Sequence, residues 1–399
     1  MSDDASPLFQ PLELPCGVIL QNRLAKAAMS DSLGDGVGNP TETQMRLYER
    51  WAEGGIGLSI IGEVQGDPNF AEKPGNLVLT EDAKLDLFRT LARRGACGET
   101  QIWLQLGHAG AMTYAPTGTP KGPSAIDIPE LKSDALSVTE IRELPQRFAE
   151  TARLGRNLGF GGVEIHAAHG FLLSQFLSPL FNRRHDAYGG SIQNRMRLLM
   201  EVIEAVRGAV GPFFPVGVKL NATDQLEGGL VPKEALEVVA ALNEMSVDLI
   251  DISGGTYFPG AASASDTTVT GAYFVHFARA ARDRTQVPLM VTGGFKTRAE
   301  AIEVVTAGNA DVIGLARSLV LDPSLPRRWR NGAFERQGDI RFPRFDNPPE
   351  GGITAWYTMR LTDIGEDRES QSVNLPKAVT AYEARDAERV DRWRHHFNT

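Results

Sequence analysis

Runs of β-branched and aliphatic residues alternate with amphipathic helical patterns along most of this chain, and that alternation limits the possible folds more than any other feature. Strands that alternate with helices run parallel in one sheet. Eight such units within about 320 residues predict an α/β protein built as a closed (β/α)8 barrel. An open, doubly wound sheet is the alternative, but no Gly-x-Gly-x-x-Gly pattern follows the first strand. The expected strands are Leu24–Ala28, Gly57–Ile61, Gln101–Leu106, Gly162–His166, Pro215–Leu220, Asp248–Ile252, Pro288–Thr292 and Asp311–Gly314.

The barrel is expected to occupy residues 1–346, and a C-terminal tail of different character follows at 347–399. The tail begins with NPPEGG and ends in the charged stretch EARDAERVDRWRHH, which predicts a partly helical segment outside the barrel. Two roles are open for it: a packing surface, for example between copies of the chain in a homo-oligomer, or a lid that brings Trp356 and Tyr357 to a site. The helices expected between the strands include Glu81–Arg94, Val138–Leu158, Ile192–Arg207, Pro232–Asn243 and Arg298–Thr306.

The amino-acid composition argues against some classes of binding partner. Hydrophobic residues make up 42% and charged residues 23% of the chain, as in folded globular proteins. The formal net charge of −9 argues against binding to nucleic acid or to an anionic membrane. Cys16 and Cys97 are the only cysteines, so we expect a reducing cytoplasm rather than a disulfide framework. The acidic N-terminus has no signal-peptide pattern, and no apolar run reaches the ~18 residues of a membrane-spanning helix.

Three of the expected strands each carry a polar residue on the face that should point into the barrel. Because side chains alternate along a strand, the apolar neighbours of Gln105, His166 and Lys219 face the helices and these three residues face inward. Barrel enzymes have their active sites at the C-terminal ends of the strands, where these residues stand. One polar residue there would be ordinary for a solvated rim, but three in register predict a site.

The loops after the last two strands predict a phosphate site. Gly293 and Gly294 follow the seventh strand, and Ala316 and Arg317 follow the eighth. In many barrels these two loops bind phosphate through backbone N–H groups, and the guanidinium would add a permanent positive charge. We therefore expect a phosphate-bearing ligand.

Two other uses of these residues are open. His166 and His169 could bind a metal, but HxxH on a loop is not a common zinc spacing, and Glu164 is the one inward carboxylate nearby. We expect no metal. Lys219 could form a Schiff base in a barrel that acts on phosphorylated sugars, which would require burial and a lowered pKa.

Five stretches together resemble the old yellow enzyme family of FMN-dependent oxidoreductases, over roughly Pro7 to Pro323. The most specific is HAAHGFLLSQFLSPLFNRRHDAYGGSIQNR, from His166 to Arg195. The others are LQNRLAKAAMS, QLGHAG, VGVKL and VTGGF. The resemblance implies a (β/α)8 barrel with non-covalent FMN at its C-terminal mouth, and NADH or NADPH as the electron donor.

The resemblance also implies the cofactor contacts. Ser30 would lie near flavin O4 and Gln105 at the pyrimidine edge. Lys219, where the family usually carries Arg, would lie beside N1 and O2, where a positive charge stabilises the reduced flavin. The isoalloxazine is expected beside Ala27, Ala28, Met29 and Gly62, and the phosphate on Gly293, Gly294, Ala316 and Arg317.

The catalytic roles follow from the same resemblance. His166 and His169 would hold the oxygen of an electrophilic small molecule while hydride reaches the β-carbon of an activated alkene, such as an enone or nitroalkene, in a ping-pong cycle. A quinone is the other acceptor that the family suggests. N–H donors placed in advance stabilise the charge that grows on the oxygen.

Phe171 departs from the family, which usually has Tyr here as the proton donor to the α-carbon. Water, Tyr114 or Tyr257 could supply the proton instead, since both tyrosines are in loops that could reach the site. The acceptor could need no such proton, as with a quinone or nitro compound, or belong to another class. General acid catalysis contributes about 10²–10⁴-fold, so without a substitute donor we expect slow enone turnover and retained quinone reduction. A flavin-binding module without turnover is a further alternative.

Overall fold

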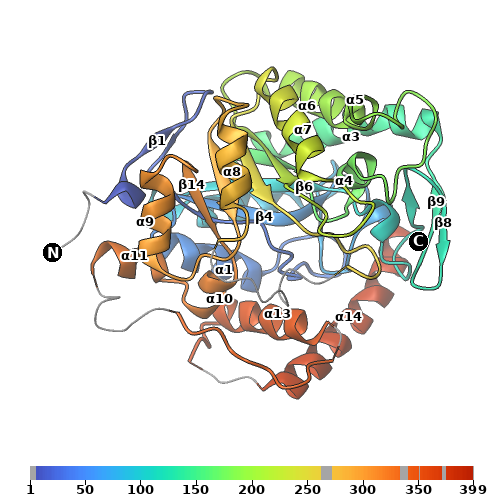
Figure 1. Ribbon diagram of the computed structural model, residues 1–399. Coiled ribbons are helices and arrows are strands. Elements are labelled where there is room, and N and C mark those ends of the chain that lie inside the picture. Colours follow the sequence, from blue (N-terminus) through green and yellow to red (C-terminus); the bar gives the residue numbers. More distant parts are fainter. Residues whose placement is uncertain (1–5, 262–271, 333–339, 350, 371–373, 399) are drawn as a thin grey trace.

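The computed structural model describes residues 6–261, 272–332, 340–349, 351–370 and 374–398 (Figure 1). In these residues the strands run in the order β3-β14-β13-β12-β11-β10-β6-β4, and β4 pairs with β3 to close the ring. Every pairing around the ring is parallel, so the predicted (β/α)8 barrel is confirmed. Each expected strand overlaps one of the barrel strands, which are β3 (Leu24–Lys26), β4 (Leu58–Gln65), β6 (Gln101–Gly107), β10 (Gly162–Ala167), β11 (Val216–Asn221), β12 (Leu249–Ser253), β13 (Leu289–Thr292) and β14 (Val312–Leu315).

Helices follow the strands, and several begin at residues that favour helix N-termini. Ser137 and Glu140 form a capping box at the start of α3, and Thr297 and Glu300 form another at the start of α9. Pro232 opens α7, where the missing N–H is not needed. The helices are α1 (Glu42–Glu53), α2 (Leu85–Gly95), α3 (Val138–Asn157), α4 (Leu172–Leu177), α5 (Ile192–Arg195), α6 (Arg197–Val210), α7 (Pro232–Asn243), α8 (Val275–Arg282), α9 (Arg298–Thr306), α10 (Arg317–Leu321) and α11 (Leu325–Arg330).

Two helices differ from the sequence prediction. The helix expected from Glu81 begins only at Leu85, because the preceding chain is held in turns and the N–H of Lys84 donates to Asn39 Oδ1. The helix expected from Ile192 is divided at Met196 into α5 and α6.

The barrel interior is apolar toward the N-terminal ends of the strands. Trp103, Ile60 and Met290 pack there with Ala25 of β3 and with Ala27 just beyond it. The short strands β1 (Leu12–Glu13) and β2 (Ile19–Leu20) form an antiparallel hairpin whose buried Leu20 joins the same cluster and closes that end. Gln105, His166 and Lys219 lie toward the opposite, C-terminal ends of their strands. The remaining strands are β5 (Leu77–Val78), which extends from β4, and a three-stranded sheet of β7 (Lys121–Gly122), β8 (Ile126–Ile128) and β9 (Leu131–Ala135).

The described part of the tail forms two helices, α13 (Gly352–Gly365) and α14 (Leu375–Phe397), drawn in red in Figure 1. α13 packs against α1 and α10, and α14 packs against α13. Arg50 of α1 forms an ion pair with Glu369 at 2.7 Å. Arg389 of α14 donates to the carbonyl of Ser32 at 2.5 Å, so the tail returns to the loop that follows β3.

Candidate active site

The inward polar residues meet at the C-terminal end of the barrel. His166 of β10 is in register with Lys219 of β11, and Lys219 is in register with Asp251 of β12. Glu164, one inward position below His166, is in register with Gln105 of β6. The structure therefore brings the three residues singled out in the sequence, Gln105, His166 and Lys219, onto three neighbouring strands.

Lys219 lies in a buried ion-pair network. Its Nζ forms an ion pair with Asp251 and lies 3.7 Å from Glu164 Oε2. Gln105 Nε2 donates to Glu164 at 2.6 Å, and Thr292 Oγ1 donates to Asp251 at 2.6 Å. Burial lowers the pKa of Lys219, but the two carboxylates outweigh burial and the pKa is raised. A charged Lys219 argues against the Schiff-base alternative, which requires a lowered pKa.

His166 and His169 face each other at the mouth, with ring centres 5.2 Å apart. His169 takes a φ of 62°, and its backbone N–H donates to Asn221 Oδ1 at 3.0 Å. Its Nε2 shares a hydrogen bond with Ser253 Oγ at 2.9 Å, whereas the buried Nδ1 of His166 has no partner in the described part of the chain. Burial, and then the charge of Lys219, lower the pKa of His169 to about 3. Burial also lowers the pKa of His166 well below its usual value, so both rings are neutral near pH 7 and each keeps one N–H donor.

The aromatic residues named in the sequence separate into two groups. Phe171, 3% exposed, precedes α4, and its ring centre is 5.1 Å from that of His166. The ring of Tyr257 lies 5.7 Å from Phe171, which places Tyr257 at the rim of this site with 62% of the residue exposed. Tyr114 instead packs against Lys73, whose ammonium lies 4.8 Å from the ring centre.

The residues expected beside the isoalloxazine lie together at the ends of β3 and β4. Ser30 forms a parallel bridge with Gly62. A Cβ on Gly62 would lie 3.0 Å from Gln105 Oε1 and 3.1 Å from the side chain of Ala28, so a larger residue would crowd this corner. The group brought together comprises Ala27, Ala28, Met29, Ser30, Gly62 and Gln105.

The turns that follow β13 and β14 open onto a pocket. Gly293 and Gly294 have φ values of 112° and 87°, a region that favours glycine. Together with Ala316 and Arg317 they line a pocket of about 560 Å³. Tyr357 of α13 forms part of its other wall. The tail therefore reaches the pocket that the sequence predicts for the phosphate.

Sequence reasoning missed Glu63. The second strand was expected to end at Ile61, but β4 continues to Gln65. Glu63 is 4% exposed, and its Oε1 lies 3.5 Å from Nε2 of His166. Polar residues at 63 and 65 flank the apolar Val64, and this short polar–apolar–polar pattern could have indicated that the strand continues past Ile61.

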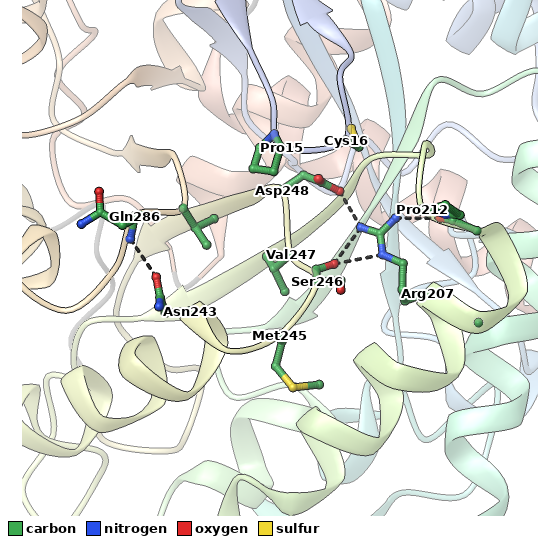
Figure 2. A pocket seen from close by; sticks show the side chains of 13 residues that line it. Pro15, Cys16, Arg207, Pro212, Asn243, Met245, Ser246, Val247, Asp248 and Gln286 are labelled. Carbon is green, nitrogen blue, oxygen red and sulfur yellow. Dashed lines mark hydrogen bonds and ion pairs between the residues drawn. The ribbon is translucent and has the colours of Figure 1, made fainter.

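A larger pocket, of about 730 Å³, lies at the opposite end of the barrel (Figure 2). Arg207 and Asp248 form an ion pair in its wall, next to Cys16. Asp248 immediately precedes β12, so the pocket is at the N-terminal ends of the strands, the face associated with stability in barrels. Burial raises the pKa of the Cys16 thiol to about 11, which makes the thiol unreactive. This pocket includes none of the residues that the sequence predicts for the site.

Two properties of the described residues bear on metal and membrane binding. These residues include no group of three or more His, Cys, Asp or Glu side chains arranged to hold a metal ion. Among the helices described, none is both long and apolar enough to span a bilayer.

Comparison with known proteins gives consistent matches. Residues 7–335 match the model of the NADH:flavin oxidoreductase / NADH oxidase family. The chain is 35% identical over 385 residues to the NADH-dependent flavin oxidoreductase iliE of Hypocrea jecorina, covering 86% of this chain and 95% of the relative. It is also 35% identical to the NADPH dehydrogenase of Bacillus licheniformis, covering 80% of this chain and 93% of the relative. The fold is similar to the solved old yellow enzyme homologue of Zymomonas mobilis, with a TM-score of 0.73 and 24% identity, covering 88% of this chain and 98% of that one.

The fold, the site and these matches define an oxidoreductase built on a flavin-binding barrel. The chain belongs to the NADH:flavin oxidoreductase / NADH oxidase family, that of the old yellow enzymes, with FMN as cofactor and NADH or NADPH as electron donor. The residues present fit FMN. The buried Nδ1 of His166 and Oε1 of Glu164 lack partners in the described chain, as expected of atoms that face a ligand, and the pocket at Gly293 and Gly294 suits a phosphate.

Proposed function

We propose that the protein reduces activated alkenes, such as enones and nitroalkenes, or quinones, with electrons from NADH or NADPH in a ping-pong cycle. The observation that supports this best is the pair of neutral imidazoles, His166 and His169, held 5.2 Å apart at the barrel mouth. Neutral N–H donors in a buried site stabilise an oxygen that gains negative charge during reaction.

Each side chain has a role in this proposal. Bound FMN would supply the hydride transfer. His166 and His169 hold and orient the oxygen of the electrophile, and Lys219 supplies a fixed positive charge beside them. Arg317 and the turn at Gly293 and Gly294 hold the phosphate. Phe171 forms an apolar wall that sets the shape of the substrate site and keeps water away from it.

A second candidate function is the reduction of quinones or nitro compounds with poor activity on alkenes. Phe171 favours it, because a phenyl ring cannot protonate a carbon and these acceptors require no such protonation. The two candidates predict different substrate profiles for the same protein.

The proposal includes an assignment of the chain's two parts. Residues 1–346 would form the catalytic barrel, and the tail at 347–399 would close the phosphate pocket. We place the protein in the cytoplasm, which its free thiols at Cys16 and Cys97 support. A homo-oligomer remains a prediction, which size-exclusion chromatography with light scattering would check.

Anaerobic spectroscopy tests the proposed function. The purified protein should be yellow, should bleach when NADH or NADPH is added, and should recover its colour with cyclohexenone, a nitroalkene or a quinone. Stopped-flow rates across that panel separate the two candidates. A yellow protein that neither nucleotide bleaches would point to a binding module, and a colourless protein that borohydride traps with substrate would point to a lyase; either result contradicts the proposal.

A further inference from the structure

The side chain of Glu63 enters the active site from β4, toward the histidine pair. Its Oε1 lies 3.5 Å from Nε2 of His166, and Gln65 Nε2 donates to Oε2 at 3.2 Å. A separation of 3.5 Å exceeds the usual hydrogen-bond length of about 2.7–3.2 Å, so the carboxyl group and the imidazole face each other without being locked together. The carboxyl group of Glu63 therefore lies beside the imidazole that, in the proposed function, holds the substrate oxygen.

The fold provides room for this approach. β6 lies between β4 and β10 in the barrel, and the residue of β6 beside the carboxyl group is Gly107. A Cβ on Gly107 would lie 2.9 Å from Glu63 Oε2, so any larger residue would displace the carboxyl group. The register of β4 on β6 also shifts between Ile61 and Val64, and such an irregularity redirects the side chain within it.

We propose that Glu63 is the general acid that protonates the α-carbon of an activated alkene in this enzyme, the role that Phe171 cannot perform. This inference rests on the proposed function. The proton would come from a carboxylic acid, whereas the family resemblance leads to a phenol.

The surroundings of Glu63 favour the protonated form of its carboxyl group. Burial raises the pKa of Glu63 well above its usual value, and the carboxylate of Glu72 raises it further, against the donor Gln65. The titratable groups that face it are Glu72, His166 and Tyr257. His166 is neutral and so adds no positive charge that would favour the carboxylate. A neutral carboxylic acid in an apolar site can donate a proton at neutral pH.

Atoms and electrons are conserved in the proposed reduction of the alkene. The β-carbon of the alkene gains a hydride, and the π-electron pair of the C=C bond becomes negative charge shared between the α-carbon and the oxygen held by His166 and His169. The O–H bond of Glu63 then breaks and a C–H bond forms at the α-carbon. Glu63 is left as a carboxylate and recovers its proton from water before the next turnover.

Tyr257 is the rival donor. Its ring contacts Phe171, but the residue is 62% exposed and lies at the rim, whereas Glu63 is buried and faces the histidine that binds the substrate oxygen. Water reaching the site would be the third source. The two side chains can be tested separately because each can lose its acidic proton with little change of shape.

The test compares Glu63→Gln and Tyr257→Phe with wild type, with Glu130→Gln, on an exposed turn, as the matched control. We expect Glu63→Gln to slow reoxidation of the reduced protein by cyclohexenone by about 100-fold or more. Reoxidation by a quinone and bleaching by NADH or NADPH should stay within about threefold of wild type, since neither protonates a carbon of the acceptor. An unchanged enone rate in Glu63→Gln, or a larger loss in Tyr257→Phe, overturns the proposal.

A second measurement does not depend on turnover. Infrared spectra at pH 7 should contain a protonated-carboxyl C=O band in wild type that Glu63→Gln removes and that shifts in D2O. If the difference spectrum shows an ionised carboxylate instead, Glu63 cannot be the acid. Failure of the proposed function itself would look different, because wild type would then not bleach with either nucleotide.

Discussion

The guanidinium of Arg317, the first residue of α10, lies over the ring of Tyr357 on α13, with its central carbon 5.7 Å from the ring centre. Arg317 is the residue expected at the FMN phosphate, and Tyr357 belongs to the tail. The contact connects the tail to the cofactor end of the barrel, and it explains why the phosphate pocket would depend on residues outside the barrel.

Tyr357→Ala should weaken FMN binding. Loss of a cation–π contact worth about 0.5–2 kcal/mol would raise the dissociation constant of FMN by roughly 2- to 30-fold. Flavin fluorescence, which rises on release, measures that constant. Tyr357→Phe should stay near wild type because the ring remains, and Phe213→Ala, at a residue 81% exposed, is the surface control. Equal FMN affinity in Tyr357→Ala and wild type would exclude a cofactor role for this contact.

Lys219→Met should destabilise the fold. Removal of the ammonium leaves the carboxylate of Asp251 buried without its partner, and breaking a buried ion pair typically costs about 3–5 kcal/mol. Urea unfolding of the apoprotein measures the change. Lys132→Met, which removes an exposed ion pair with Asp127, should have little effect. A Lys219→Met protein as stable as wild type would show that the network is not held by this charge.

Phe171→Tyr should reveal whether a phenol can replace the carboxylic acid. In a wild-type background the enone rate should change by less than about threefold, because Glu63 already supplies the proton. In a Glu63→Gln background the same substitution should restore about tenfold or more of the lost rate. Stopped-flow reoxidation by cyclohexenone gives both numbers. A large gain in the wild-type background would mean that protonation limits the natural protein.

Stability should fall in acid partly because of His169. Its pKa is about 3 when folded, below the usual value near 6.5, so the unfolded chain binds one more proton between these values. The stabilising contribution is complete above pH 6.5 and is lost as the pH falls toward 3, by about 2 kcal/mol between pH 6.5 and 5. His169→Asn should flatten the pH dependence of urea unfolding by that amount. His395→Asn, at an exposed residue of α14, should leave the slope unchanged, and equal slopes in all three proteins would contradict the assignment.

Much of the architecture could be predicted from local pattern. The eight strands and the inward faces of Gln105, His166 and Lys219 follow from alternation along each strand, which depends only on neighbouring residues. The turn at Gly293 and Gly294 could also be predicted from local sequence, because the positive φ values of these two residues favour glycine. Helix ends were less predictable: Lys84 is held out of α2 by Asn39, a partner 45 positions away in the chain.

The sequence by itself determined which residues could face the barrel mouth, because the period of a strand is a local property. Tertiary structure alone decided what those residues meet there. The register of β11 on β12 places Asp251 beside Lys219. Gly107 of β6 leaves room for Glu63 to face His166. Tyr357 of the tail packs against Arg317. The pKa shifts follow from the same cause. Burial and neighbouring charge arise only when distant segments pack together, so neither the lowered pKa values of the histidines nor the raised pKa of Glu63 could be predicted from the order of residues.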